Sequence, residues 1–145
     1  MSYAYALMTP AQIDEFLRAP RFAIVGTNRT DGAPQLTPVW YLFEDGRLYL
    51  TIYVNSAKFR NLSRDPRIGV CVAAEHPDAR AVMIYGTAEL IRDVDARYED
   101  IDWRLSRRYH DSDEETHAYI DSLPAEQENA LVIVTPDKFI AEDYN

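Results

Sequence analysis

The chain has 145 residues, of which 47% are hydrophobic and 27% are charged, and its formal net charge is −9. This length allows one domain, residues 1–145, to bury a core without disulfides or metals, and the single cysteine excludes an internal disulfide framework. The acidic balance argues against nucleic acid as a partner, because phosphate binding requires a basic face.

The first half of the chain predicts a helix followed by antiparallel strands. The helix begins at Thr9-Pro10-Ala11-Gln12, where a threonine cap, a proline at the first helical position and a following glutamine satisfy the free amides, and it ends at Pro20. Three strand-like runs follow at 21–27, 35–43 and 47–54, separated by turn residues rich in Asp and Gly. In the third run, leucine, isoleucine and valine alternate with tyrosine and threonine, as in a strand with two different faces. These runs predict an antiparallel meander rather than a βαβ unit.

A short helix and two more strands are predicted next. Ser56 caps a helix that extends to about Ser63, and Asp65-Pro66 stops it. Strands follow at 67–74 and 81–91.

The last third of the chain predicts two helices before the final strands. The first helix runs from Asp93 to about His110, and the second covers 114–123. The apolar stripe of the first consists of Val94, Tyr98, Ile101 and Leu105. The chain closes with strands at 131–135 and 139–141 around a turn at Pro136-Asp137. Six or seven short strands with peripheral helices favour a small, mainly β barrel, and an open α+β sheet is the alternative.

The sequence shows neither a membrane anchor nor a secretion signal. No apolar run approaches the ~18 residues that a membrane-spanning helix needs. The first residues lack the basic start and the long apolar stretch of a signal peptide. We therefore expect a cytoplasmic protein with no membrane partner.

Charge is distributed unevenly along the chain. Residues 93–128 contain 12 acidic and 4 basic side chains, which is most simply a solvated helical face. Residues 55–67 reverse the sign, because Lys58 and three arginines outnumber Asp65. A short basic island in an acidic protein indicates an anion site, although chance clustering on a solvated helix would give the same pattern.

The junction at Ser56 has the chemistry of a phosphate site. A strand runs directly into a helix start there, so free backbone amides, the positive helix end, the Ser56 hydroxyl and the Lys58 ammonium converge. Lys58 and Lys138 are the only lysines among 15 basic residues, which makes a lysine at this turn notable. The alternative is an ordinary capped helix with surface charges.

These segments resemble the pyridoxamine 5′-phosphate oxidase-like superfamily of flavin-binding split barrels. The resemblance rests on Thr37-Pro38-Val39-Trp40-Tyr41-Leu42-Phe43, on Leu48-Tyr49-Leu50-Thr51, and on Ser56-Ala57-Lys58-x-Arg60-Asn61-Leu62-x-x-Asp65-Pro66-Arg67. Within the superfamily, the chain is similar to flavin- and deazaflavin-dependent oxidoreductases that use coenzyme F420. The resemblance implies a six-stranded antiparallel split β-barrel that forms a homodimer with a cofactor at each end of the subunit interface.

The resemblance also assigns a cofactor site. It implies that Ser56 and Lys58 hold the cofactor phosphate with Arg60 and Asn61 nearby. Thr37, Val39 and Trp40 would lie along the ring system, and Thr51, Ile52 and Tyr53 would flank its other edge. The chain departs from typical pyridoxamine phosphate oxidases at Thr37 and Ala57, where those enzymes carry arginine. Without these two arginines, which can each donate two hydrogen bonds to a phosphate, binding of the FMN phosphate is weaker. We therefore favour coenzyme F420, with FMN as the alternative.

Hydride transfer requires no side-chain nucleophile, so we expect no catalytic acid or base. The leading prediction is an oxidoreductase that uses F420 to reduce a small conjugated substrate. The alternatives are an FMN-dependent oxidase or reductase and a non-catalytic module that binds a flavin. Four aromatic residues are candidates for walls of the substrate pocket or for ordinary packing: Trp40, Tyr41, Tyr53 and Trp103. His110 and His117 lie among acids, but their spacing matches no metal motif, and we expect no metal site.

Overall fold

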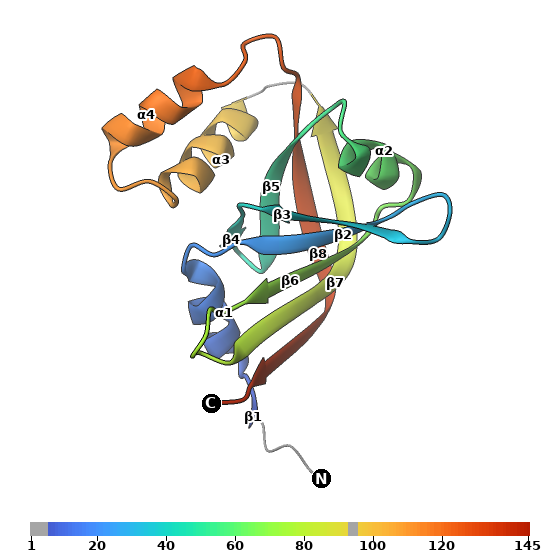
Figure 1. Cartoon of the computed structure of the whole chain (residues 1–145), viewed down its shortest axis with the longest axis vertical. Coiled ribbons are helices and arrows are strands. Elements are labelled where there is room, and N and C mark those ends of the chain that lie inside the picture. Colours follow the sequence, from blue (N-terminus) through green and yellow to red (C-terminus); the bar gives the residue numbers. More distant parts are fainter. Residues whose placement is uncertain (1–5, 93–95) are drawn as a thin grey trace.

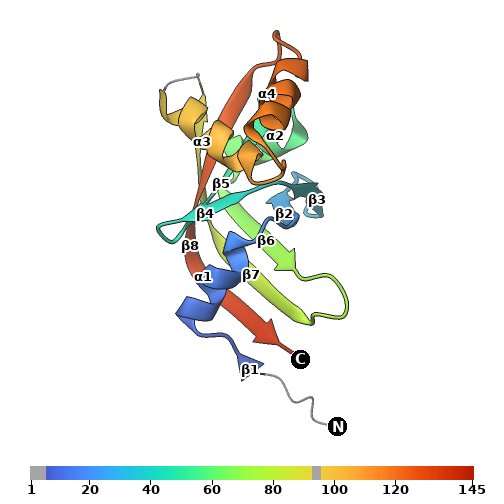
Figure 2. The same ribbon diagram turned by 90° about the vertical axis from the view of Figure 1, so that its left-hand side faces the viewer.

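The computed structural model describes residues 6–92 and 96–145, and its centre is a curled antiparallel sheet (Figure 1). In chain order the elements are β1 (Ala6–Leu7), α1 (Pro10–Arg18), β2 (Ala23–Asn28), β3 (Pro34–Val39), β4 (Leu42–Glu44), β5 (Arg47–Tyr53), α2 (Ala57–Arg64), β6 (Arg67–Ala73), β7 (Arg80–Arg92), α3 (Ala96–Arg107), α4 (Asp113–Ser122) and β8 (Asn129–Asp143). Helices α2, α3 and α4 gather at one end of the sheet, whereas α1 lies toward the end that carries β1 and the C-terminus (Figures 1 and 2). None of the helices described here is long and apolar enough to span a membrane.

The strands form one sheet of eight, in the order β3-β2-β6-β7-β8-β5-β4, with β1 paired to β8 beside this path. Every pairing is antiparallel, and the predicted mainly β split barrel with peripheral helices is confirmed. The structure has eight strands, compared with the seven runs predicted from the sequence and the six strands implied by the resemblance. The short β1 is additional, one predicted run is divided into β3 and β4, and the last two predicted runs join as β8.

That division falls at Trp40 and Tyr41, inside the predicted strand 35–43. The Tyr41 side chain is fully buried, and its hydroxyl donates to the carbonyl of Leu17 at 3.0 Å, at the end of α1. Its backbone amide donates to the Tyr109 hydroxyl at 3.1 Å instead of to a neighbouring strand. The chain therefore leaves β3 at one edge of the sheet and enters β4 at the opposite edge. The predicted meander was wrong, although both hairpins, β2–β3 and β4–β5, form.

The final strand is continuous, so the predicted turn at Pro136-Asp137 was also wrong. Tyr85 of β7 pairs with Lys138 and Gly86 pairs with Pro136, which leaves Asp137 as an extra residue in a β-bulge. The strands approach closely at this point, because a Cβ on Gly86 would lie 2.3 Å from the carbonyl oxygen of Thr135. Pro136, which has no amide hydrogen to donate to the ladder, is tolerated here because the regular hydrogen-bond pattern is interrupted at the bulge.

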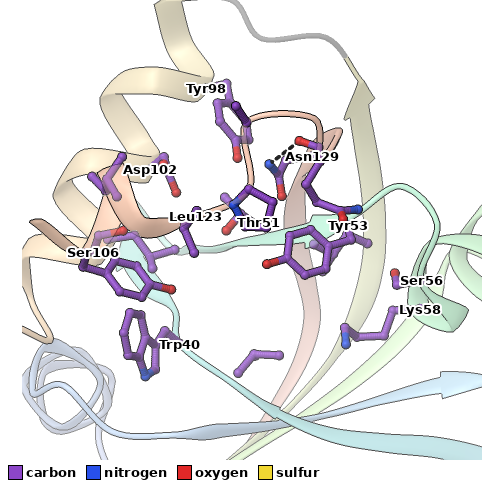
Figure 3. Close-up of a pocket in the computed structure, with 18 of the residues that line it drawn as sticks. Trp40, Thr51, Tyr53, Ser56, Lys58, Tyr98, Asp102, Ser106, Leu123 and Asn129 are labelled. Carbon is purple, nitrogen blue, oxygen red and sulfur yellow. Dashed lines mark hydrogen bonds between the residues drawn. The ribbon is translucent and has the colours of Figure 1, made fainter. Parts of the chain in front are cut away.

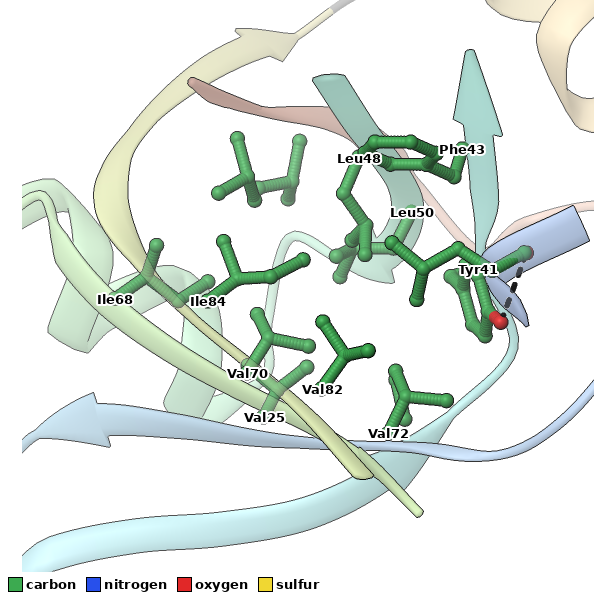
Figure 4. Packing of buried hydrophobic residues seen from close by; sticks show 14 of the residues in the cluster. Val25, Tyr41, Phe43, Leu48, Leu50, Ile68, Val70, Val72, Val82 and Ile84 are labelled. Carbon is green, nitrogen blue, oxygen red and sulfur yellow. Dashed lines mark hydrogen bonds between the residues drawn. The ribbon is translucent and has the colours of Figure 1, made fainter. Parts of the chain in front are cut away.

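The core fills the concave side of the sheet (Figure 4). The alternation predicted for β5 is confirmed, because Leu48, Leu50 and Ile52 belong to this cluster. Tyr49 faces the other way and joins a second cluster, in which the sheet packs against α3. The α3 members of that cluster are Tyr98, Ile101 and Leu105, as the stripe predicted. The predicted helix start at Asp93 and the stripe residue Val94 lie outside the described residues.

Both predicted helix starts in the first half of the chain are confirmed. At α1, the Thr9 amide donates to Gln12 Oε1 at 2.8 Å, and the Gln12 amide donates to Thr9 Oγ1 at 3.2 Å, which completes a capping box. At α2, Ser56 is the cap, and its Oγ accepts from the Phe59 amide at 3.2 Å. The α2 helix therefore begins directly after β5, so the free amides of its first turn lie beside the end of that strand.

Candidate functional site

A cavity of about 700 Å³ lies between the sheet and the α3–α4 pair (Figure 3). One wall consists of the end of β3, the last residues of β5 and the start of α2. The opposite wall consists of α3, α4 and the segment that leads from α4 into β8. The volume lies within the range of small-molecule and cofactor sites.

The β5–α2 junction supplies hydrogen-bond donors to the first wall. The Ser56 amide donates to the carbonyl of Tyr53 at 3.0 Å, which fixes the turn into α2. In the described part of the chain, the amides of Ala57 and Lys58 have no acceptor, as expected in the first turn of a helix. These free donors and the positive end of the helix favour an anion at this corner.

Lys58 is the cationic member of this wall. Its side chain lines the cavity and is half-buried, and burial lowers the pKa of its ammonium group below the ordinary value. Across residues 6–92 and 96–145, no carboxylate forms an ion pair with it. A partly desolvated, unpaired cation is costly, and a bound anion would offset that cost.

The opposite wall carries an acid and several hydroxyl groups. Asp102 of α3 lines the cavity, and burial raises the pKa of its carboxyl group. Tyr98 and Tyr119 line the same region, and burial together with the charges of Tyr53 and Asp102 raises the pKa of both phenols. Figure 3 shows Asp102 and Lys58 at opposite ends of the cavity, which is therefore electrically asymmetric.

Trp40 closes the cavity at the break between β3 and β4. Its ring stacks on Tyr109, with centroids 4.7 Å apart and planes 6° apart, and it packs against Tyr119 at 5.2 Å. His110 meets its edge at 5.5 Å, and His110 Nδ1 lies 2.8 Å from the Ser106 carbonyl oxygen. The histidine thus belongs to an aromatic cluster, and no group of possible metal ligands occurs in the described part of the chain.

Seven of the residues predicted to bind a cofactor line this one cavity: Val39, Trp40, Thr51, Ile52, Tyr53, Ser56 and Lys58. Of the four aromatic candidates for pocket walls, Trp40 and Tyr53 line it. Tyr41 is instead buried in the core, and Trp103 packs on His117 with ring centroids 4.5 Å apart.

The other three predicted residues, Thr37, Arg60 and Asn61, do not line the cavity. Arg60 donates to the carbonyl of Asn55 at 3.0 Å, and Asn61 is buried and donates to Thr27 Oγ1 at 3.1 Å. The Thr37 hydroxyl oxygen is buried without a hydrogen-bond partner among the described residues.

Sequence reasoning missed the α3–α4 wall. The acidic region 93–128 was interpreted as solvated, yet Asp102 is half-buried and lines the cavity. A signal was present, because Asp102 follows Tyr98 by four residues and so lies on the same helix face as the apolar stripe. An acid on an inward-facing stripe requires a structural or functional reason.

The sequence profile of pyridoxamine 5′-phosphate oxidase matches residues 9–139. A conserved hypothetical protein from Mycobacterium tuberculosis is similar in structure, with a TM-score of 0.81 and 25% identity over 96% of this chain and 87% of that one. An FAD-binding protein from Mesorhizobium loti gives a TM-score of 0.67 at 18% identity, over 96% and 97% of the two chains. A structure described as F420 reductase gives 0.60 at 19% identity, over 87% of this chain and 94% of the other.

Proposed function

The chain belongs to the pyridoxamine 5′-phosphate oxidase family, and from that premise we propose that its cavity binds a phosphate-bearing flavin or deazaflavin for hydride transfer. The single observation that carries this proposal is Lys58, a half-buried cation without an ion-pair partner among the described residues, which lines the cavity at a helix start. Proteins of similar fold include one described as FAD-binding and one described as F420 reductase, which is consistent with a flavin-type cofactor.

The phosphate fits the corner formed by Ser56 and Lys58. The free amides of the first α2 turn, the helix dipole and the ammonium group all favour negative charge at that point. The Ser56 oxygen already accepts from Phe59, so its hydroxyl hydrogen is the part that could donate to a ligand. The acid at the far end of the cavity, Asp102, would disfavour a phosphate there, so the cofactor is oriented by charge.

The ring system fits between β3 and β5. Val39 and Trp40 offer an apolar and aromatic surface on one side, and Thr51, Ile52 and Tyr53 follow the edge of β5. When bound, the cofactor supplies the hydride chemistry. The side chains of the cavity bind and orient the ring and keep water from it.

We favour coenzyme F420 over FMN as the cofactor, because Thr37 and Ala57 provide no forked cationic donor beside the phosphate corner. The reaction would be the reduction of a small conjugated substrate. FMN is the alternative cofactor, and flavin binding without turnover is the alternative role.

We also propose that the chain forms a homodimer through the outer face of β3, β2, β6 and β7. Leu36 and Tyr85 lie over Gly26 and Gly69 on this face, and Leu36 is 64% and Tyr85 49% exposed. Ile24 of β2 is also exposed, so apolar side chains of β2, β3 and β7 lie open on this face, as is typical of a protein–protein contact. Phe22 borders this face, is 61% exposed and also lines the cavity, so a partner would complete one side of the cofactor site.

Separate titrations with F420 and FMN, followed by tryptophan fluorescence, test the proposal, because Trp40 lines the cavity. We expect Lys58→Ala to weaken binding of the preferred cofactor by about 10- to 100-fold, as for the loss of one charge-assisted contact. The matched control is Lys138→Ala, which removes the other lysine, exposed on β8 and outside the cavity. Unchanged affinity in Lys58→Ala would remove Lys58 from the site. Failure of the reduced complex to pass electrons to any acceptor would favour the non-catalytic role.

A further inference from the structure

The wall of the cavity opposite Lys58 brings a partly buried carboxylate, Asp102, together with a set of aromatic side chains, and a second carboxylate, Asp121 of α4, lines the cavity from an exposed position. Asp102, Tyr98, Tyr119 and Tyr53 come from α3, α4 and β5, and all four line the cavity. Tyr98 and Asp102 are four residues apart on α3, so they lie on the same face of that helix, and Figure 3 shows both on the side of the cavity away from Lys58. Trp40 extends the aromatic surface, since its ring packs against Tyr119 with centroids 5.2 Å apart.

Asp102 has no cationic partner among the described residues. Two of the three arginines of α3 are engaged elsewhere, because Arg104 pairs with Glu44 and with Asp100, and Arg107 pairs with Asp113. The third, Arg97, is exposed and does not line the cavity. Lys58 is the cation in the cavity lining, and it lies at the end away from Asp102 (Figure 3). Burial raises the pKa of the Asp102 carboxyl group, as expected when a carboxylate loses water and gains no compensating charge.

A partly buried carboxylate that lines the same cavity wall as several aromatic side chains has the chemistry that recognises an organic cation. The carboxylate supplies the opposite charge, and the electron-rich faces of Tyr and Trp attract a cation at contact distance. The tyrosine hydroxyls can accept hydrogen bonds from an N–H donor. A phosphate or carboxylate ligand would be repelled at this end, so the aromatic–acid end differs in specificity from the Lys58 corner.

We propose that the Asp102 end of the cavity binds a positively charged nitrogen group of the substrate. This inference rests on the proposed function, because it places the substrate beside the cofactor ring between the two charged ends. It narrows the substrate class to small conjugated molecules that carry an amine, an amidine or a similar cationic group. Asp102 acts in binding and specificity, and the hydride comes from the cofactor.

The test compares benzamidine, a planar cation at neutral pH, with benzamide, an uncharged molecule of nearly the same shape. We expect the wild-type protein to bind benzamidine about tenfold or more tightly than benzamide, as measured by calorimetry and by the fluorescence of Trp40. Asp102→Asn should remove this preference by weakening benzamidine alone. Glu99→Gln, an exposed charge on the same helix outside the cavity, is the matched control and should keep it.

Equal affinity of the wild-type protein for the two probes, or binding of neither, would overturn the inference, and this comparison needs no variant. A preference that persists in Asp102→Asn would overturn the role of that residue. F420 and FMN titrations of the same preparation separate the two proposals. If a cofactor binds in a Lys58-dependent manner while benzamidine shows no advantage, the cation site fails and the cofactor site stands.

Discussion

Gly86→Ala should destabilise the protein strongly, because two strands meet at Gly86 with no room for a side chain. The added Cβ would lie 2.3 Å from the carbonyl oxygen of Thr135 and 3.0 Å from Cα of Pro136. Such contacts are essentially never shorter than 3.0 Å, so β7 and β8 would have to separate by about 0.7 Å at the bulge. The obstruction is backbone, which cannot rotate away as a side chain can.

We expect this substitution to cost about 3 kcal/mol or more of unfolding free energy, at the upper end of the range for overpacking. Urea unfolding at fixed protein concentration measures it by linear extrapolation. Gly32→Ala is the control, because Gly32 has a φ of +90° and nothing within 4 Å of an added Cβ. That variant should lose only the conformational cost of about 1–2 kcal/mol. Equal losses in the two variants would refute the close-approach explanation.

Three further predictions concern the cavity and its supports. Lys58→Met should raise the unfolding free energy at neutral pH without ligand, because it removes a charge that burial disfavours. Since the folded-state pKa is lowered, the wild-type protein should recover stability as the pH rises toward the unfolded pKa of about 10.4, and unfolding curves at several pH values should show the difference shrink. Tyr109→Phe should cost about 1–3 kcal/mol in urea unfolding, because the hydroxyl donates to the backbone carbonyl of Arg21 and accepts from the Tyr41 amide in a partly buried position. Asn61→Ala should cost a similar amount through its buried contact with β2 but leave cofactor affinity unchanged in the fluorescence titration, since its side chain does not line the cavity.

The sequence predicted the helix caps and the tight turn that depend on residues close together in the chain. The capping box at Thr9 and the cap at Ser56 involve partners three residues apart, so the sequence alone reveals them. The Asp45-Gly46 hairpin is equally local, and both residues have positive φ.

The errors arose where distant contacts decide the structure. The strand predicted through Trp40 and Tyr41 breaks because the Tyr41 hydroxyl and amide bind groups that lie 24 and 68 residues away. The turn predicted at Pro136-Asp137 is a bulge because β7 is long enough to pair with both halves of β8. Neither fact can be obtained from a window of neighbouring residues.

The candidate site likewise has one part that the sequence predicts and one that depends on contacts between distant segments. The Lys58 corner follows from a strand that ends where a helix begins, which the sequence shows directly. The Asp102 wall depends on α3 and α4 folding back over β5, which the apolar stripe indicates only in part. Asn61, which the family resemblance places near the cofactor phosphate, is directed by the α2 helix toward Thr27 of β2.

The contribution of the cofactor phosphate to affinity tests the central claim most directly. For whichever of F420 and FMN binds more tightly, its affinity can be compared with that of the same ring system without phosphate, in the wild-type protein and in Lys58→Ala. We predict that the wild-type protein prefers the phosphorylated form by about tenfold or more and that Lys58→Ala loses most of that preference. Equal affinity for the two forms in the wild-type protein, or an undiminished preference in the variant, would contradict a phosphate site at the β5–α2 junction.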